Sequence, residues 1–133
     1  MAQEDQEIRR TDPVSKLVIG ACIEVHRALG PGLLETAYEA CLARELTLRG
    51  LPFKTQVPLR IAYKGGLVDC AYRLDLVVCD SVVVELKSVE QLLPIHLAQV
   101  LTYLKLTGHP IGLLVNFNVP SLRRGLRRLT LQP

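Results

Sequence analysis

The sequence has few aromatic residues and no tryptophan. Two phenylalanines together with Tyr63 and Tyr72 are too few to predict a surface on which nucleic-acid bases stack. None of the four cysteines belongs to a C-x-x-C pair, which excludes a zinc knuckle and a thioredoxin-like motif. His26 and His109 have no partner at metal-ligand or catalytic-triad spacing. We therefore expect a cytoplasmic protein with reduced cysteines and no histidine-based zinc site.

Long hydrophobic runs and glycine-rich nucleotide loops are missing as well. The longest apolar run near the N-terminus, residues 17–23, is far too short to span a bilayer, and no basic leader precedes it. Gly30-Pro31-Gly32 lacks the spacing of a nucleotide-binding loop and fits a turn between two helices. We expect neither a membrane segment nor an export signal.

Charge is weak overall but uneven along the chain. The net charge of +3 is too small to indicate a nucleic-acid-binding protein by itself. Residues 119–133 nevertheless form a basic segment without an acidic residue, with Arg123, Arg124, Arg127 and Arg128. Such a segment fits either contacts with phosphates or a solvated charged face.

The chain is long enough for one domain with a hydrophobic core, since 49% of its 133 residues are hydrophobic. We expect this domain to span residues 13–133, after a flexible polar segment over residues 1–12. Asp12-Pro13 is typical of a helix start, with an N-cap residue followed by a proline at the first helical position. The first helix should therefore begin at Pro13 and end near Leu29.

Hydrophobic periodicity predicts an α/β protein with the order α-α-β-β-β-α-β. The expected helices after the first span residues 33–48 and 94–107, and the expected strands span 53–63, 67–78, 82–88 and 111–117. The end of the chain, residues 119–131, fits either a short helix or an edge strand.

Three charged residues lie inside apolar strands, at Asp75, Glu85 and Lys87. Charged groups in buried strands are costly unless they are paired or bound to a metal. Glu85 and Lys87 are two residues apart and therefore share one face of the sheet. If residues 79–81 form a three-residue loop, Val78 pairs with Val82 and Asp75 lies opposite Glu85.

Two carboxylates and a neighbouring backbone carbonyl are the hard oxygen ligands that Mg²⁺ prefers. The alternative from these residues alone is a salt-bridge cluster on a solvent-facing sheet surface. On the later helix, His96, Gln99 and Tyr103 line one face because they are three and four residues apart. A core-facing tyrosine and a surface glutamine would explain the same spacing, and these residues alone favour that explanation.

Several motifs resemble one known family. Gly32-x-x-Glu35-x-x-Tyr38 matches the name-giving motif of the GxxExxY proteins, which are small bacterial and archaeal members of the PD-(D/E)XK nuclease superfamily. Further similar segments are Glu24-Val25-His26, Arg73-x-Asp75, Val84-Glu85-Leu86-Lys87, Leu93-Pro94-Ile95-His96, Gln99-x-x-x-Tyr103, Leu104 to Gly108 and Leu114 to Asn118. The resemblance covers nearly the whole chain, although Leu74 replaces the proline of the superfamily signature.

The resemblance implies a restriction-endonuclease-like core, with a mixed central sheet of about four to five strands flanked by helices. It also implies a metal site of Glu35, Asp75 and Glu85, with Asp75, Glu85, Lys87, Gln99 and Tyr103 as catalytic residues. Gln99 and Tyr103 resemble the Q-x-x-x-Y element of RecB-like nucleases, which helps to position the nucleic-acid strand. Arg73, Arg123 and Arg124 are further candidates for contacts with nucleic acid.

The expected function is metal-dependent hydrolysis of phosphodiester bonds in nucleic acid, chiefly DNA, with Mg²⁺ or with Mn²⁺ as a substitute. Lys87 would orient the attacking water and stabilise negative charge on the phosphate. The alternative is a catalytically inactive nucleic-acid-binding or protein-interaction module with the same fold. A chain this small offers little surface for sequence-specific recognition, so a homodimer or a partner protein is also expected.

Overall fold

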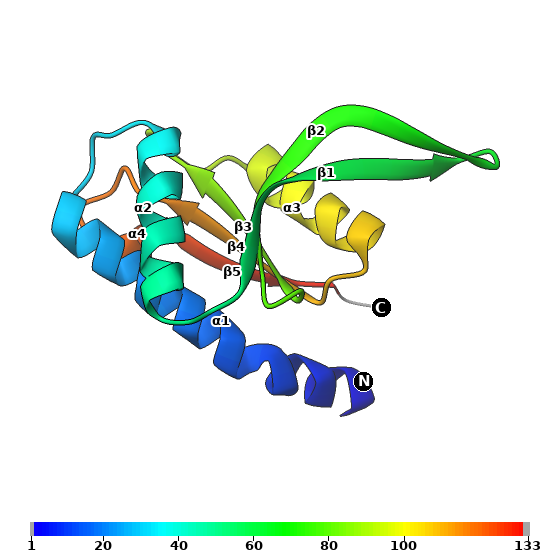
Figure 1. The fold of residues 1–133 in the computed structure, drawn as a ribbon, viewed down its shortest axis with the longest axis horizontal. Helices are drawn as coiled ribbons and strands as arrows, with labels where there is room; N and C mark the ends of the chain where they lie inside the picture. The colour runs from blue at the N-terminus through cyan, green and yellow to red at the C-terminus, as the bar shows by residue number, and fades with distance from the viewer. Residues whose placement is uncertain (1, 132–133) are drawn as a thin grey trace.

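Two helices come first along the chain, as the sequence predicts. The computed structural model describes the backbone of residues 2–131 and the side chains of residues 13–131. Helix α1 spans Ala2–Leu29 and helix α2 spans Glu35–Leu48 (Figure 1). The end of α1 at Leu29 is confirmed, and Gly30 follows it with a left-handed φ of 69°.

The predicted start of the first helix is wrong. Helix α1 begins at Ala2, and Pro13 lies inside it. The proline removes one backbone hydrogen bond, but the helical backbone continues through it. The predicted flexible segment, residues 1–12, lies outside the residues whose side chains are described. That segment and the single domain over residues 13–133 stay predictions.

The remaining elements follow the predicted order and add two at the end. They are β1 (Phe53–Tyr63), β2 (Gly66–Val78), β3 (Val82–Lys87), α3 (Pro94–Thr107), β4 (Ile111–Asn116), α4 (Leu122–Gly125) and β5 (Leu126–Thr130). The ambiguous end of the chain therefore contains both a short helix and an edge strand. Helix α3 has the predicted bounds because Pro94 occupies its first turn and Gly108, with φ 77°, ends it.

The five strands form one mixed sheet in the order β1-β2-β3-β4-β5. Strands β3 and β4 are parallel because α3 carries the chain back across the sheet between them, and the other three neighbouring pairs are antiparallel. The α/β fold class and the mixed sheet flanked by helices are confirmed. Among the described residues, no helix is long and apolar enough to cross a lipid bilayer.

Helices cover both faces of the sheet. On one face, α1 and α2 pack against the even-numbered residues of β3 and the odd-numbered residues of β4. Val18, Tyr38, Leu76 and Val84 belong to this larger core. On the other face, Tyr103 and Leu104 of α3 pack in a smaller core. That smaller core also contains Leu59, Leu74, Val77 and Val83.

The β1–β2 hairpin changes faces partway along its length. Leu76 belongs to the core under α1 and α2, whereas Leu74 belongs to the core under α3. Residues two apart in a regular strand share a face, so the alternation is broken at the residue between them, Asp75. Strand β1 changes at the same level, because Phe53 packs against the larger core and Val57 against the smaller one.

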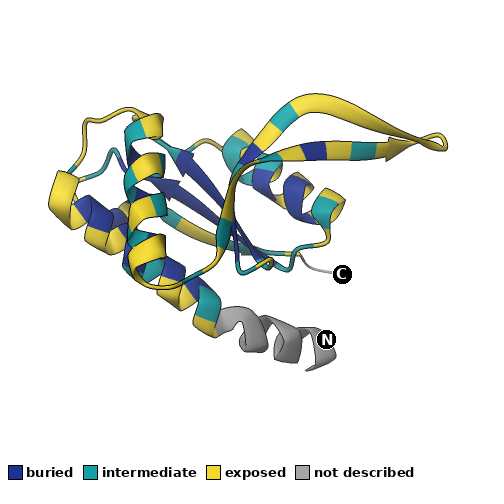
Figure 2. Ribbon diagram, in the orientation of Figure 1, coloured by how far each residue is buried: buried dark blue, intermediate teal, exposed yellow. Residues whose placement is uncertain are grey.

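Beyond this crossover the hairpin projects from the body of the molecule, and most of its residues are exposed (Figures 1 and 2). Its tip is a two-residue turn at Lys64-Gly65, with φ angles of 47° and 80°. Two left-handed residues match the twist of a tight hairpin. The two central strands β3 and β4 are buried along almost their whole length.

Candidate functional site

The predicted register of the β2–β3 hairpin is confirmed. Val78 pairs with Val82, and the last backbone pair is Leu76 with Val84. Beyond that pair two side chains bridge the strands. The Asp75 N–H donates to Glu85 Oε1 at 3.1 Å, and the Leu86 N–H donates to Asp75 Oδ2 at 2.8 Å. The two carboxylates therefore lie together where the backbone ladder of β2 and β3 ends.

Burial makes this carboxylate pair costly to ionise. Glu85 is only 2% exposed, and its pKa rises from 4.5 to about 8, first because of burial and then because of the Asp75 charge. Burial also raises the pKa of Asp75, and the charges of Glu39 and Glu35 raise it further. The hydrogen bond from the Leu86 N–H and the charge of Lys87 lower this pKa. A positive charge between these groups would stabilise their ionised forms.

Two stacked tyrosines support Glu85 from the α3 side of the sheet. The Tyr72 hydroxyl donates to Glu85 Oε2 at 3.2 Å, and its ring stacks on Tyr103 with centroids 4.8 Å apart. Burial, followed by Tyr103 and Glu85, raises the pKa of Tyr72. The sequence alone did not indicate this role of Tyr72. Tyr103 is 7% exposed and reaches the site through Tyr72, while Gln99 is half-buried one turn earlier on α3.

The loop before α2 holds Glu35 beside the end of β3. The Ser88 N–H donates to Glu35 Oε1 at 3.3 Å, and the Ser88 hydroxyl donates to the Leu33 carbonyl at 2.5 Å. The Tyr38 hydroxyl donates to the Gly30 carbonyl at 2.6 Å and accepts the Leu33 N–H at 3.2 Å. The tyrosine of the G-x-x-E-x-x-Y motif thus secures the loop that leads into Glu35.

A small hollow of about 80 Å³ lies between α2 and the β2–β3 junction. Its lining residues are Glu35, Thr36, Glu39, Gln56, Asp75 and Leu86. Gln56 Nε2 donates to Glu39 Oε1 at 2.7 Å, which links β1 to α2. Glu39 and Gln56 were not among the site residues predicted from the sequence. The signal for Glu39 was its position four residues after Glu35, on the same helical face, and Gln56 carries no sequence signal.

The donor set fits a hard divalent cation. Asp75, Glu85 and Glu35 offer carboxylate oxygens, the ligand type that Mg²⁺ prefers. Across residues 13–131, however, no group of three or more His, Cys, Asp or Glu side chains has the arrangement of a formed metal site. The Glu35 carboxylate accepts from Ser88, and those of Asp75 and Glu85 accept from backbone N–H groups. The three-residue metal site stays a prediction.

Of the predicted basic site residues, Lys87 acts on the two carboxylates through its charge. Lys87 is half-buried, and its charge lowers the pKa of both Asp75 and Glu85. Arg73 is exposed, and the regular alternation that would put residues 73 and 75 on one face of the sheet is interrupted at Asp75. Arg123 and Arg124 are exposed on α4, which leads into the edge strand β5. Their contacts with nucleic acid stay predictions.

Comparison with known proteins identifies one family. The family model described as PD-(D/E)XK nuclease superfamily matches residues 12–129 of the chain. Proteins of this superfamily are usually nucleases and generally use divalent metal ions. The mixed five-stranded sheet flanked by helices is consistent with the restriction-endonuclease-like fold. No curated protein and no solved structure matches the chain, and the narrower resemblance to GxxExxY proteins stays a prediction.

Proposed function

The chain belongs to the PD-(D/E)XK nuclease superfamily, and from this premise we propose that it is a Mg²⁺-dependent nuclease that hydrolyses phosphodiester bonds of DNA. The observation that carries the proposal is the hydrogen bond between the Asp75 N–H and the buried Glu85 carboxylate at the end of the β2–β3 ladder. A structural salt-bridge cluster would place cations against both carboxylates. Here burial raises the pKa of both carboxyls. The charge of Asp75 raises the pKa of Glu85 further, and the charges of Glu39 and Glu35 raise the pKa of Asp75 further.

Asp75 and Glu85 would hold the ion, with Glu35 as the third carboxylate. When bound, such an ion supplies positive charge that polarises the scissile phosphate and makes a water molecule more acidic. The Tyr72 hydroxyl fixes one oxygen of Glu85, and the Leu86 N–H fixes one oxygen of Asp75. Carboxylates held in this way need little rearrangement before they act.

Lys87 lies two residues after Glu85 in the same strand and therefore on the same face of the sheet. Its ammonium group is a compact charge that can orient the attacking water and stabilise negative charge developing on the phosphate. Gln99 and Tyr103 of α3 would position the strand, and Arg73 would contact a neighbouring phosphate. Together these residues fill the catalytic and substrate-binding roles of the proposed hydrolysis.

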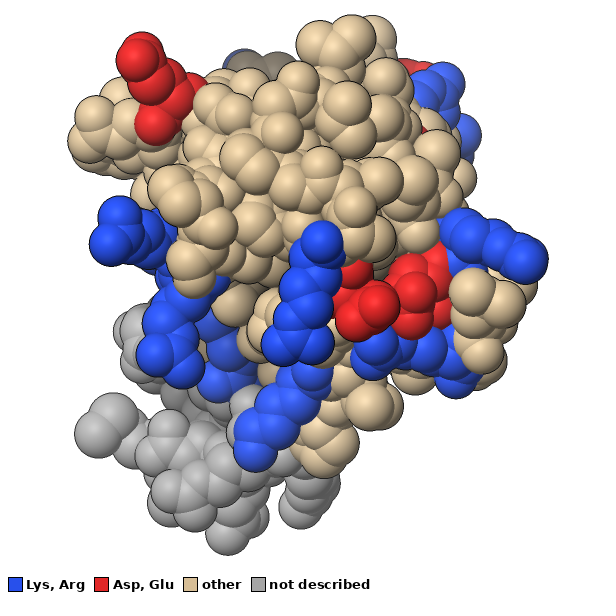
Figure 3. All heavy atoms as spheres, turned by 90° about the vertical axis from the view of Figure 1, so that its left-hand side faces the viewer, with Lys and Arg blue, Asp and Glu red and all other residues tan. Residues whose placement is uncertain are grey.

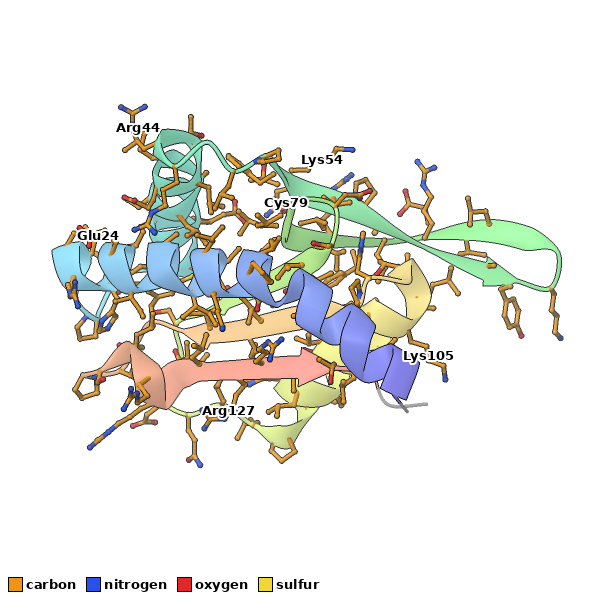
Figure 4. All side chains as sticks on the ribbon, turned by 90° about the horizontal axis from the view of Figure 1, so that it is seen from below. Glu24, Arg44, Lys54, Cys79, Lys105 and Arg127 are labelled. Atoms are coloured by element: carbon orange, nitrogen blue, oxygen red, sulfur yellow. The ribbon has the colours of Figure 1, made fainter. Side chains whose placement is uncertain are left out.

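A second candidate is a module that binds nucleic acid without cutting it. On the face seen in Figure 3, basic side chains gather over the lower half. The arginines of α4 and β5 are exposed and contribute to the basic surface of the protein. One of them, Arg127, is labelled in Figure 4. Binding through such a surface would weaken steeply as salt rises.

We propose a cytoplasmic location, which is supported by the four cysteines being free thiols. We also propose that a homodimer or a partner protein completes substrate recognition, because these 133 residues offer little surface for it.

The test is cleavage of labelled single-stranded, duplex and branched DNA with Mg²⁺ or Mn²⁺, with an EDTA control. Lys87→Ala should abolish cutting, whereas Lys105→Ala, at an exposed position of α3 labelled in Figure 4, should not. Binding without cutting on every substrate would favour the second candidate. Neither binding nor cutting would refute both.

A further inference from the structure

The crossover of the β1–β2 hairpin coincides with an unusual backbone conformation at Gln56. Its φ is 52°, in the left-handed region that non-glycine residues avoid. Asp75, which faces it across the hairpin, has no positive φ. Of the two residues at the crossover, Gln56 is therefore the one whose backbone departs from the extended conformation that keeps side chains alternating.

The backbone pairing is interrupted at this level and then resumes in the same register, whereas further out the register shifts between Leu59 and Arg60. Thr55 pairs with Leu76 and Val57 pairs with Leu74, but Gln56 and Asp75 do not pair. No residue is inserted, so the interruption is a change of direction and not an added bulge residue. Asp75 also lacks a backbone partner in β3, where the last pair is Leu76 with Val84.

Asp75 has no backbone pairing partner in β1 or in β3, and this determines where its carboxylate points. A regular strand that continued the alternation of Leu76 would keep the Asp75 side chain on the α3 face, with Val77. Instead, its carboxylate accepts the Leu86 N–H and lines the hollow with Glu35 and Glu39 of α2. The side chain thus lies between β3 and the helix that carries the third carboxylate.

We propose that Gln56 is a positioning residue for Asp75. Its left-handed backbone turns the β1–β2 hairpin over at this level and thereby directs the Asp75 carboxylate toward β3 and α2. The strained conformation persists because packing of opposite faces of the hairpin against two different cores requires it. The effect on catalysis rests on the proposed nuclease function, but the effect on the placement of Asp75 does not.

Two substitutions separate the backbone of Gln56 from its side chain. Gln56→Gly and Gln56→Val both remove the hydrogen bond to Glu39. Glycine adopts a φ of 52° without steric cost, whereas a β-branched valine strongly disfavours it. Thr55→Val is the matched control, because Thr55 is an exposed neighbour in β1 that keeps its backbone pair with Leu76.

The readout is amide hydrogen exchange of Leu86, whose N–H donates to Asp75 Oδ2, with the Val84 amide in the same strand as an internal reference. In Gln56→Val, exchange at Leu86 should accelerate at least roughly tenfold relative to Val84, because the hydrogen bond to a carboxylate is lost. Gln56→Gly and Thr55→Val should retain the native ratio. In the cleavage assay, Gln56→Val should be slower than Gln56→Gly by roughly 100-fold, as for a displaced catalytic group.

Native Leu86 exchange in Gln56→Val would overturn the proposal. Accelerated exchange in Gln56→Gly would overturn it too, because the side-chain contact with Glu39 would then be what matters. If Gln56→Val does not fold, the glycine variant decides alone: it must keep the Leu86 protection and melt no earlier than the native protein. If no variant and not even the native protein cuts DNA, the nuclease proposal fails, while the exchange ratios still test the placement of Asp75.

Discussion

Replacing Glu85 by glutamine should change how folding stability depends on pH. Glu85 is 2% exposed, and its pKa rises from 4.5 to about 8, first because of burial and then because of the Asp75 charge. Between these two pH values the folded protein holds a proton that the unfolded chain releases. The stability from this raised pKa is therefore fully present below pH 4.5 and is lost as the pH rises through about 8.

The size of the effect follows from the same shift. At about 1.4 kcal/mol per pKa unit, the rise corresponds to roughly 5 kcal/mol, part of which belongs to Asp75 because the two carboxyls titrate as a pair. Glutamine keeps the shape of the side chain and can still accept the Asp75 N–H. We expect Glu85→Gln to raise the free energy of unfolding at pH 9 by on the order of 3 kcal/mol, with a much smaller difference at pH 5.

Urea unfolding at pH 5 and pH 9 measures this difference, with EDTA present so that no divalent ion compensates the carboxylates. Glu90→Gln is the control, because Glu90 is an exposed glutamate just after β3. The reasoning is refuted if the native protein is as stable at pH 9 as at pH 5. Equal stability of the native protein and Glu85→Gln at pH 9 would refute it as well.

Four further outcomes are expected. Tyr38→Phe should lower the free energy of unfolding by about 1 kcal/mol, because the Gly30 carbonyl loses its hydroxyl donor. Thermal melting measures this loss, and the control Tyr63→Phe, at an exposed position, should show no change. Asn116→Ala should cost about 2 kcal/mol in urea unfolding, because the 2% exposed amide bonds both the N–H and the carbonyl of Val89. Gly112→Ala should cost about 1–3 kcal/mol by the same measurement, because its Cβ would lie 2.6 Å from Val100. Adding Mg²⁺ at pH 9 should stabilise the native protein by about 1.4 kcal/mol for each tenfold rise in Mg²⁺ concentration above the Kd of the site. An unchanged melting temperature would contradict the metal site.

Local structure was predictable wherever the pattern and its terminating residues agreed. Strand β1 and helix α3 have the predicted bounds, and Pro94 and Gly108 are the residues that delimit the helix. The register of the β2–β3 hairpin was predictable because the length of the loop at residues 79–81 sets it. Residues close to each feature in the sequence determine these bounds and this register.

The features that were not predictable depend on packing between distant segments. Phe53, Val57 and Leu59 alternate as if they shared one face, yet Phe53 packs under α1 and α2, and the other two pack under α3. A left-handed Gln56 has no signal of the kind that glycine or asparagine would provide. The start of α1 was misplaced because a proline typical of a first turn lies inside the helix.

The exposed turn at Lys64-Gly65 divides the chain in a useful place. Both helices α1 and α2 and strand β1 precede it, and every other element follows it. Val18 and Tyr38 from the first part and Leu76 and Val84 from the second meet in the same core. Proteolytic nicking at this tip would therefore leave two complementary fragments that hold each other through a shared interior. The same position would allow the protein to be produced as two separate halves that reassemble, or to carry an inserted reporter away from the carboxylates.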